Sequence, residues 1–242
     1  MIKVPGTAAG VPVIRSLIAE GINVNVTLLF SREAAAAVAE AYLQGLEHRA
    51  AQGEAIDQLA SVASFFISRI DTAVDALLAA HGERGQALQS RVAIANAKLA
   101  YQDYLALIAS PRWAALAAKG AKPQRLLWAS TGTKKPALVD TLYIEQLIGP
   151  QTVNTVPPAT LDAFRDHGEA ASRLLNGVIE AEQVMREVTA LGLPFAAVTE
   201  QLVVDGVKLF VDAWDKLLAA IAAKRDALQA AELGAFVQAD QG

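Results

Sequence analysis

A lysine stands inside the first strand that the sequence predicts. Lys3 lies between Ile2 and Val4, in a short β-branched run that Pro5 ends. A parallel strand is ordinarily buried on both faces, and burial disfavours the charged form of an amine. A neutral lysine is the nucleophile that forms an imine with a carbonyl substrate. Two interpretations follow: a Schiff-base lysine, or a lysine at a strand end whose ammonium group reaches solvent.

Polar residues also interrupt the clearest predicted strand, residues 22–30. Asn25 and Thr27 stand two positions apart, so they share one face of this strand. The opposite face carries Val24, Val26, Leu28 and Phe30. Polar side chains in an apolar strand need hydrogen-bond partners, so the pair would orient a substrate hydroxyl or a water. The alternative is a wetter or internally satisfied face without a ligand.

A third group of residues suits a phosphate. Ser64 and Phe66 share a face of the run 61–68, and Arg69 follows that run. Ser130 ends a later run and precedes Lys134 in the loop TGTKKP. Ligands of parallel α/β folds bind at the carboxyl ends of strands, where a guanidinium, hydroxyls and backbone N–H groups bind anions. The alternative is a solvated basic loop.

The elements that must position these residues alternate along the chain. Five β-branched runs are separated by Ala-rich helical stretches, and they cover residues 2–4, 22–30, 61–68, 125–130 and 152–156. After Gly168 only helical periodicity remains. Strands separated by helices predict βαβ units and a parallel sheet. The pattern by itself allows an open doubly wound sheet or part of a (β/α)8 barrel.

Composition excludes several classes of function. The net charge of −4 leaves no electrostatic footprint for nucleic acid, and the lack of cysteine excludes disulfides and thiolate metal sites. The three histidines are scattered, so no histidine metal cluster is predicted. No apolar run has the length of a membrane span, and the N-terminus lacks the pattern of a secretion signal. We therefore predict a cytoplasmic protein that binds neither nucleic acid nor membrane.

Seven segments, in this order, resemble the transaldolase family and most of all its longer bacterial subfamily. They are MIKVPGTAAG, GINVNVTLLFS, SVASFFISRIDTAVD, NAKLAYQDY, RLLWASTGTKKP, DTLYIEQLIGP and NTVPPATLDAFRDHG. The resemblance implies a (β/α)8 barrel and transfer of a dihydroxyacetone unit from sedoheptulose 7-phosphate to glyceraldehyde 3-phosphate, in the pentose phosphate pathway. It implies no metal or organic cofactor, because the imine itself accepts the electrons.

The resemblance also assigns a role to individual residues. Lys3 matches the lysine that attacks the ketose carbonyl, and Asn25 and Thr27 match the pair that binds substrate and holds the catalytic water. Ser64 and Phe66 match positions that line the substrate, while Arg69 and Ser130 match phosphate-binding positions. Gly132 stands where many members carry arginine, and Lys134 is expected to replace that charge.

The resemblance also predicts how much of the barrel this sequence contains. We predict a single domain over residues 1–242 that lacks the first three β/α units, with about five strands corresponding to strands four to eight and a helical segment at about 169–242. An open arc of strands exposes two edges, so a homodimer or a complementing N-terminal piece is expected. Two alternatives to transaldolase activity stay open: a class I aldolase of the fructose 6-phosphate type, and an inactive fragment or half of a split enzyme that serves as a scaffold.

Overall fold

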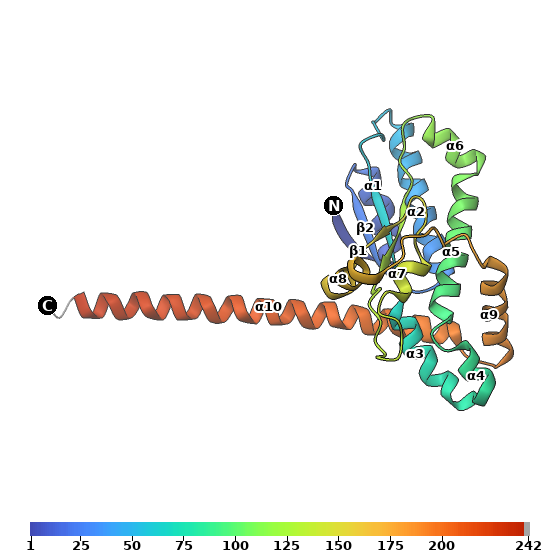
Figure 1. Cartoon of the computed structure of the whole chain (residues 1–242). Coiled ribbons are helices and arrows are strands. Elements are labelled where there is room, and N and C mark those ends of the chain that lie inside the picture. The colour runs from blue at the N-terminus through green and yellow to red at the C-terminus, as the bar shows by residue number, and fades with distance from the viewer. Residues whose placement is uncertain (240–242) are drawn as a thin grey trace. The chain divides into compact units, whose positions relative to one another are not determined.

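Five parallel strands form one sheet whose spatial order follows the order of the chain (Figure 1). The structure, a computed structural model, describes the backbone of residues 1–239 and the side chains of residues 1–229. The strands are β1 (Ile2–Pro5), β2 (Val24–Leu29), β3 (Ser61–Phe66), β4 (Arg125–Ala129) and β5 (Val153–Asn154). Consecutive parallel strands with helices between them are successive units of a barrel, and the predicted incomplete (β/α)8 architecture is confirmed.

Helices connect each strand to the next. They are α1 (Gly10–Ala19), α2 (Arg32–Ala51), α3 (Ser68–Leu78), the short 3₁₀ turn η1 (Ala79–His81), α4 (Gly82–Leu88), α5 (Val92–Ile108), α6 (Pro111–Ala117) and α7 (Leu142–Gln146). Three more follow β5: α8 (Pro158–His167), α9 (Val178–Ala190) and α10 (Phe195–Ala239). The last two occupy the expected helical segment, of which residues 240–242 lie outside the described part of the chain.

The two faces of the sheet differ in polarity. Side chains alternate along a strand, and residues paired in parallel register share a face. One face is largely apolar and covered by helices, with Val24, Val26, Phe65 and Trp128 buried, and α2 contacts both β2 and β3. The other face carries the polar residues of β1, β2 and β3 beside a small apolar cluster of Val62, Leu127 and Ala129, against which Phe66 and Val153 pack.

An irregularity ends the alternation of β2 after Thr27. The register of β2 on β3 shifts between Val26 and Leu29, and Leu28 adopts a left-handed backbone with φ of 60°. Such a conformation inserts an extra residue and re-aims the chain. The prediction of unbroken alternation through Phe30 is therefore wrong, and Thr27 is the last residue placed on the polar face by regular pairing.

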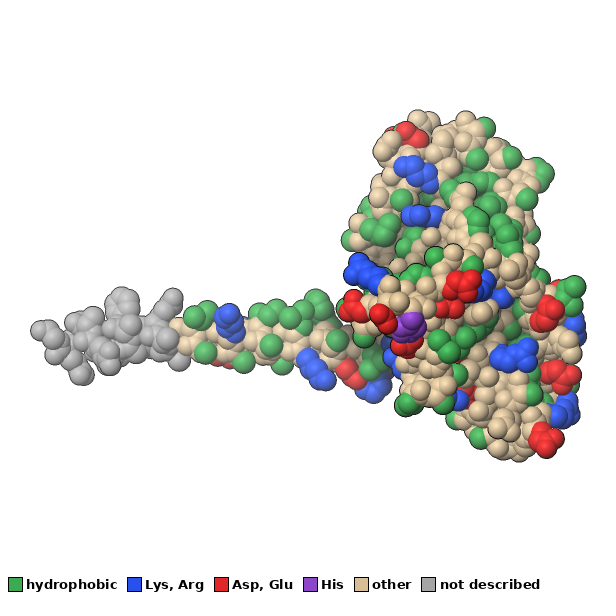
Figure 2. All heavy atoms as spheres, viewed as in Figure 1, with side chains coloured by type: hydrophobic (Ala, Val, Ile, Leu, Met, Phe, Trp, Pro, Cys, Tyr) green, Lys and Arg blue, Asp and Glu red, His purple; other side chains and the backbone are tan. Residues whose placement is uncertain are grey.

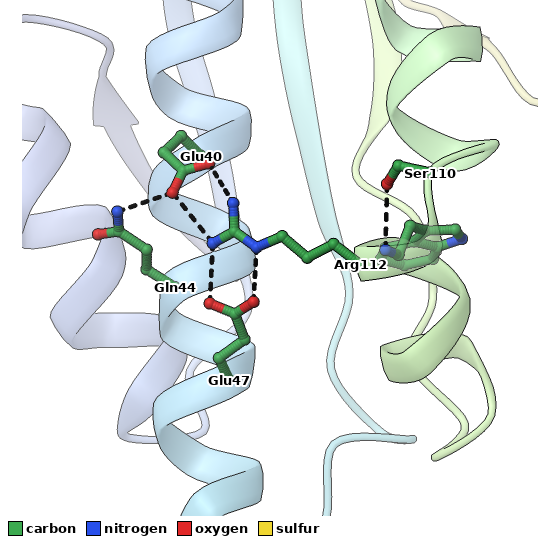
Figure 3. Close-up of polar contacts among 6 residues, drawn as sticks. Glu40, Gln44, Glu47, Ser110 and Arg112 are labelled. Carbon is green, nitrogen blue, oxygen red and sulfur yellow. Dashed lines mark hydrogen bonds and ion pairs between the residues drawn. The ribbon is translucent and has the colours of Figure 1, made fainter.

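Arg112 attaches α6 to α2 through two carboxylates (Figure 3). Its guanidinium donates to Glu40 and Glu47, with closest distances of 2.6 Å to each, and it lowers the pKa of both carboxyl groups. All three side chains are about half exposed, so the network contributes only about 1 kcal/mol. Its fork geometry instead fixes where α6 lies before the chain enters β4.

Beyond Val203 the chain forms a second compact unit that continues α10. Its apolar side chains recur at helical spacing, as the sequence predicts. Phe210, Trp214, Leu217 and Ile221 are exposed, and Figure 2 shows hydrophobic side chains along this helix. Among the described residues no single helix has the length and apolar character of a membrane span; α9 and residues 195–229 of α10 meet those criteria only as a bent pair.

Helices α1 and α2 approach each other closely at Gly45. This glycine is buried within α2, and a Cβ atom there would lie 2.7 Å from Ile18 Cβ and 2.8 Å from the carbonyl oxygen of Arg15. No real Cβ atom tolerates a backbone oxygen at that distance, so the two helices would have to separate. The contact fixes α1 on α2, and these are the helices that follow β1 and β2.

We expect Gly45→Ala to destabilise the protein by about 1–2 kcal/mol, because overpacking of about 1–3 kcal/mol exceeds the helix-propensity gain of about 1 kcal/mol. Urea unfolding measures the change. Ala37→Gly, at an exposed position of the same helix, serves as the matched control and measures the propensity difference without the contact. If Gly45→Ala proved more stable than the wild type, the close approach of α1 and α2 would be refuted.

Candidate active site

Side chains from three neighbouring strands meet on the polar face of the sheet. Lys3 of β1 pairs in register with Asn25 of β2, and Pro5 pairs with Thr27. Ser64 of β3 donates a hydrogen bond from Oγ to Asn25 Oδ1, at 2.8 Å. Lys3, Asn25, Thr27 and Ser64 are therefore brought together on one surface.

The bond from Ser64 also sets the orientation of the Asn25 amide. Because Oδ1 accepts from Ser64, the Nδ2 group is turned to donate elsewhere on this face. A second strand thus fixes the Asn25 side chain before any ligand is bound, which is the arrangement that a binding site needs.

Thr27 is a buried polar residue whose hydroxyl has no hydrogen-bond partner in the part of the chain that the structure describes. Its side chain is 1% exposed, and its hydroxyl makes no hydrogen bond within the described residues. An unsatisfied buried hydroxyl costs about 1–3 kcal/mol, so native structures rarely keep one without a reason. A substrate hydroxyl or a water beside Thr27 would remove this cost.

Lys3 itself is exposed, so the expectation of a buried lysine is wrong. Within the described sheet β1 pairs only with β2, and the neighbouring Ile2 is 53% exposed. The expectation that burial favours a neutral amine at Lys3 therefore does not apply to the exposed side chain. The position of Lys3 beside Asn25 is what connects it with the polar face.

A second group of residues lies where β3 and β4 end. The hydroxyl groups of Ser68 and Ser130 are hydrogen-bonded at 2.9 Å, and Ser68 N donates to the carbonyl oxygen of Ser130 at 3.0 Å. Ser68 is the first residue of α3, so the predicted strand 61–68 ends earlier, at Phe66. The guanidinium of Arg69 lies 5.1 Å from the centre of the Phe66 ring. Phe66, Arg69 and Ser130 are thus gathered at adjacent strand ends.

Lys134 is placed differently from the other candidates. It is exposed and lines a shallow hollow of about 450 Å³ in the loop after β4, and within the described part of the chain no hydrogen bond joins it to Arg69 or Ser130. The next residue, Lys135, forms an ion pair with Asp75 at 2.5 Å. Among the described residues no group of three or more His, Cys, Asp or Glu side chains is arranged to hold a metal ion.

Two buried carboxylates on α3 were not predicted from the sequence. Asp71 is 2% exposed and accepts hydrogen bonds from Ala93 N and from Tyr143 Oη, each at 2.8 Å. Asp75 is 4% exposed and accepts from the backbone and side chain of Ser90. Their spacing could have indicated them. Acidic residues four positions apart on a helix repel each other, so a buried pair needs hydrogen-bond donors from other segments.

Burial raises the pKa of Asp71 to about 6, against the bonds from Ala93 and Tyr143, which favour the ionised form. The nearby charge of Asp75 raises this pKa further. Burial and the Asp71 carboxylate in turn raise the pKa of Tyr143, so its phenol stays a hydrogen-bond donor at neutral pH.

Because the folded state binds the Asp71 proton more tightly than the unfolded state does, the Asp71 contribution to stability falls as pH rises from about 4 to about 6. The shift corresponds to about 3 kcal/mol. We expect Asp71→Asn to gain stability relative to the wild type by up to that amount across this range, measured by chemical unfolding at several pH values. Asp162→Asn, at an exposed carboxylate, should show no such trend. Parallel curves for wild type and Asp71→Asn would contradict the raised pKa.

Comparison with known proteins adds an independent finding. The model of the family described as transaldolase/fructose-6-phosphate aldolase matches residues 1–221. A transaldolase 2 from a Nostoc species is 48% identical over 236 residues, which cover 93% of this chain and 62% of the relative. A transaldolase from a Parafrankia species is 51% identical over 219 residues, which cover 90% of this chain and 59% of the relative. A Neisseria meningitidis transaldolase is 48% identical over 219 residues, with coverages of 90% and 61%. The chain thus spans about three fifths of the length of these curated relatives.

Proposed function

The chain belongs to the transaldolase/fructose-6-phosphate aldolase family, and from this premise we propose that it performs transaldolase chemistry. A dihydroxyacetone unit is transferred from a ketose phosphate such as sedoheptulose 7-phosphate to glyceraldehyde 3-phosphate. One observation carries the proposal: the register of β1 on β2 lays Lys3 beside Asn25, on the face that also holds Thr27 and Ser64. We assign the reaction to the pentose phosphate pathway of the cytoplasm, by analogy with the family.

Lys3 is the proposed nucleophile. Its neutral Nζ adds to the C2 carbonyl of the ketose, and loss of water gives a protonated imine. The C4 hydroxyl then gives up its proton to water, the bond between C3 and C4 breaks, and its electron pair moves into the imine to form an enamine. The C4 fragment leaves as an aldehyde. The enamine carbon attacks the carbonyl of the acceptor aldehyde, and hydrolysis of the new imine releases the product and the free lysine.

Three polar residues of this face are assigned to individual steps. We assign the Asn25 amide to a substrate hydroxyl, because Ser64 already occupies its Oδ1. Thr27 is assigned to the water that is lost and regained at the imine, since its buried hydroxyl has no partner among the described side chains. Ser64 and Phe66 line the substrate on β3. These assignments rest on the geometry of the face together with the family resemblance.

The phosphate end of the substrate is assigned to the ends of β3 and β4. Arg69 supplies the positive charge and Ser130 a hydroxyl, and both lie at the first turn of α3 or against it. Lys134 is the proposed second cation, since Gly132 carries no charge. A guanidinium binds a phosphate with two parallel hydrogen bonds, which gives direction as well as affinity.

The family description also covers fructose-6-phosphate aldolase, which defines the second candidate function. The two activities share the imine and differ in the fate of the enamine, which is protonated in an aldolase and attacks an aldehyde in a transaldolase. Product analysis with and without glyceraldehyde 3-phosphate separates them. Release of dihydroxyacetone at an undiminished rate in the presence of the acceptor would favour the aldolase.

Borohydride reduction in the presence of fructose 6-phosphate should label Lys3, because only an imine is reduced to a stable adduct. Peptide mapping locates the label, and Lys3→Arg should abolish it. Lys98→Arg is the matched control, since Lys98 is a buried lysine whose pKa burial lowers. A label on Lys98, or one that persists in Lys3→Arg, would overturn the assignment of Lys3.

We expect Arg69→Ala to raise KM for phosphorylated substrates by roughly 10- to 100-fold, because a charge-assisted contact contributes about 1.5–3 kcal/mol. The KM for free dihydroxyacetone as donor should change little. Steady-state kinetics with both donors measures the difference, and Arg84→Ala removes an exposed arginine from α4 as the control. An equal effect of Arg69→Ala on both donors would make Arg69 a structural residue.

A further inference from the structure

One face of α3 is bonded to the chain at three places from the end of β4 to the start of α7. Ser68, Asp71 and Asp75 stand at helical spacing, so they share that face. Ser68 binds Ser130 directly after β4, Asp75 binds Lys135 in the loop that follows, and Asp71 binds Tyr143, the second residue of α7. Three positions on one face of α3 thus hold the loop after β4 and the start of α7, at sequence separations of 62, 60 and 72 residues.

The carboxylates of α3 are themselves fixed from the opposite side. Ser90, in the turn between α4 and α5, donates to Asp75 from its N at 2.9 Å and from its Oγ at 3.1 Å. Ala93 N, in the first turn of α5, donates to Asp71. Because the α4–α5 turn and α5 orient both carboxylates, their direction does not depend on the loop that they hold. They therefore act as rigid acceptors for it.

A second attachment holds the start of this loop from the other side. Thr131 is fully buried and donates from Oγ1 to Asn154 Oδ1 at 2.9 Å, which joins the loop to β5. At Gly132 a Cβ atom would lie 3.2 Å from Thr160 Oγ1 of α8, so there is little space for a side chain. The loop is thus fixed between α3 and the β5–α8 region, with Lys134 exposed between these attachments.

The ion pair divides the roles of two adjacent lysines. Asp75 neutralises Lys135, whereas Lys134 points to solvent. Holding Lys135 against α3 restricts the backbone that carries Lys134 and Ser130. A site whose donors are held in place before binding loses less conformational freedom when the ligand arrives.

We propose that Asp75, acting through Lys135, is a positioning residue for the phosphate end of the substrate. It sets the loop of residues 131–137 so that Ser130 and Lys134 present their donors together with Arg69. The inference rests on the proposed function, because it takes a sugar phosphate as the ligand. Asp75 touches no substrate atom in this scheme and acts only on affinity for the phosphate.

The test compares Asp75→Asn, Lys135→Met and the double variant. Each single variant should raise KM for fructose 6-phosphate by roughly 3- to 10-fold, with kcat and the KM for free dihydroxyacetone nearly unchanged. The KM of the double variant should not exceed that of the more severe single variant, because both changes break the same contact. Lys135→Arg should restore the wild-type KM, and Lys122→Met, at a surface lysine before β4, is the control.

Hydrogen exchange supplies a readout that does not depend on catalysis. Residues 131–141 should exchange about tenfold faster in Asp75→Asn and Lys135→Met, while β3 and β4 keep their protection. Lys135 is 43% exposed in its side chain, so Lys135→Met should fold even if Asp75→Asn does not. Faster exchange without any change in KM, or an equal rise in KM for both donors, would overturn the positioning role.

The same variants separate this inference from the proposed activity. If the wild type shows no turnover, calorimetric binding of fructose 6-phosphate replaces KM as the readout. Binding that weakens in Lys135→Met and recovers in Lys135→Arg would support the positioning role while refuting the transaldolase assignment. Equal binding by all variants, or no binding by the wild type, would overturn the inference.

Discussion

The parallel register of β1, β2 and β3 determines which side chains share a face, and the candidate site depends on it. Pairing of Lys3 with Asn25, and of Asn25 with Val62, places every second residue of each strand on the polar face. The opposite face then receives Val24, Val26 and Phe65, whose burial holds the helices against the sheet. A slip by one residue would exchange the two sets, so the apolar core and the polar site are specified by the same pairing.

The polar face contains a hydrogen-bonded pair, Asn25 and Ser64, and a buried hydroxyl, that of Thr27, with no partner among the described residues. Asn25 and Ser64 satisfy each other in part, which preserves their direction. Thr27 is buried with its hydroxyl unpaired among the described residues, and the irregularity at Leu28 follows it directly. Local departures from regular pairing often occur beside functional residues, because they re-aim a side chain that a regular strand cannot.

Helix α3 links the sheet to the loops at its carboxyl end. Its buried carboxylates carry a desolvation cost, which appears in the raised pKa of Asp71, and hydrogen bonds from four different segments offset that cost. An apolar contact of the same size would hold these segments without fixing their direction. Buried, hydrogen-bonded carboxylates fix direction as well, which suits loops that must present donors to a ligand.

The sequence determined the elements, the family and the list of candidate residues. Runs such as 22–30 and 61–68 predicted strands because they are rich in β-branched and aromatic residues. The segment around Lys3 and the segment GINVNVTLLFS carried the family resemblance. Only the tertiary structure decided which of these residues meet. Lys3 is exposed because β1 pairs with β2 alone in the described sheet. The left-handed backbone of Leu28 ends the regular alternation of β2, and nothing in the sequence pattern indicated that break. In the sequence, Asp71 and Asp75 are typical of the solvent-exposed face of a helix, yet both are buried. Their hydrogen-bond partners come from segments that only folding brings to α3, namely Ser90, Ala93, Lys135 and Tyr143.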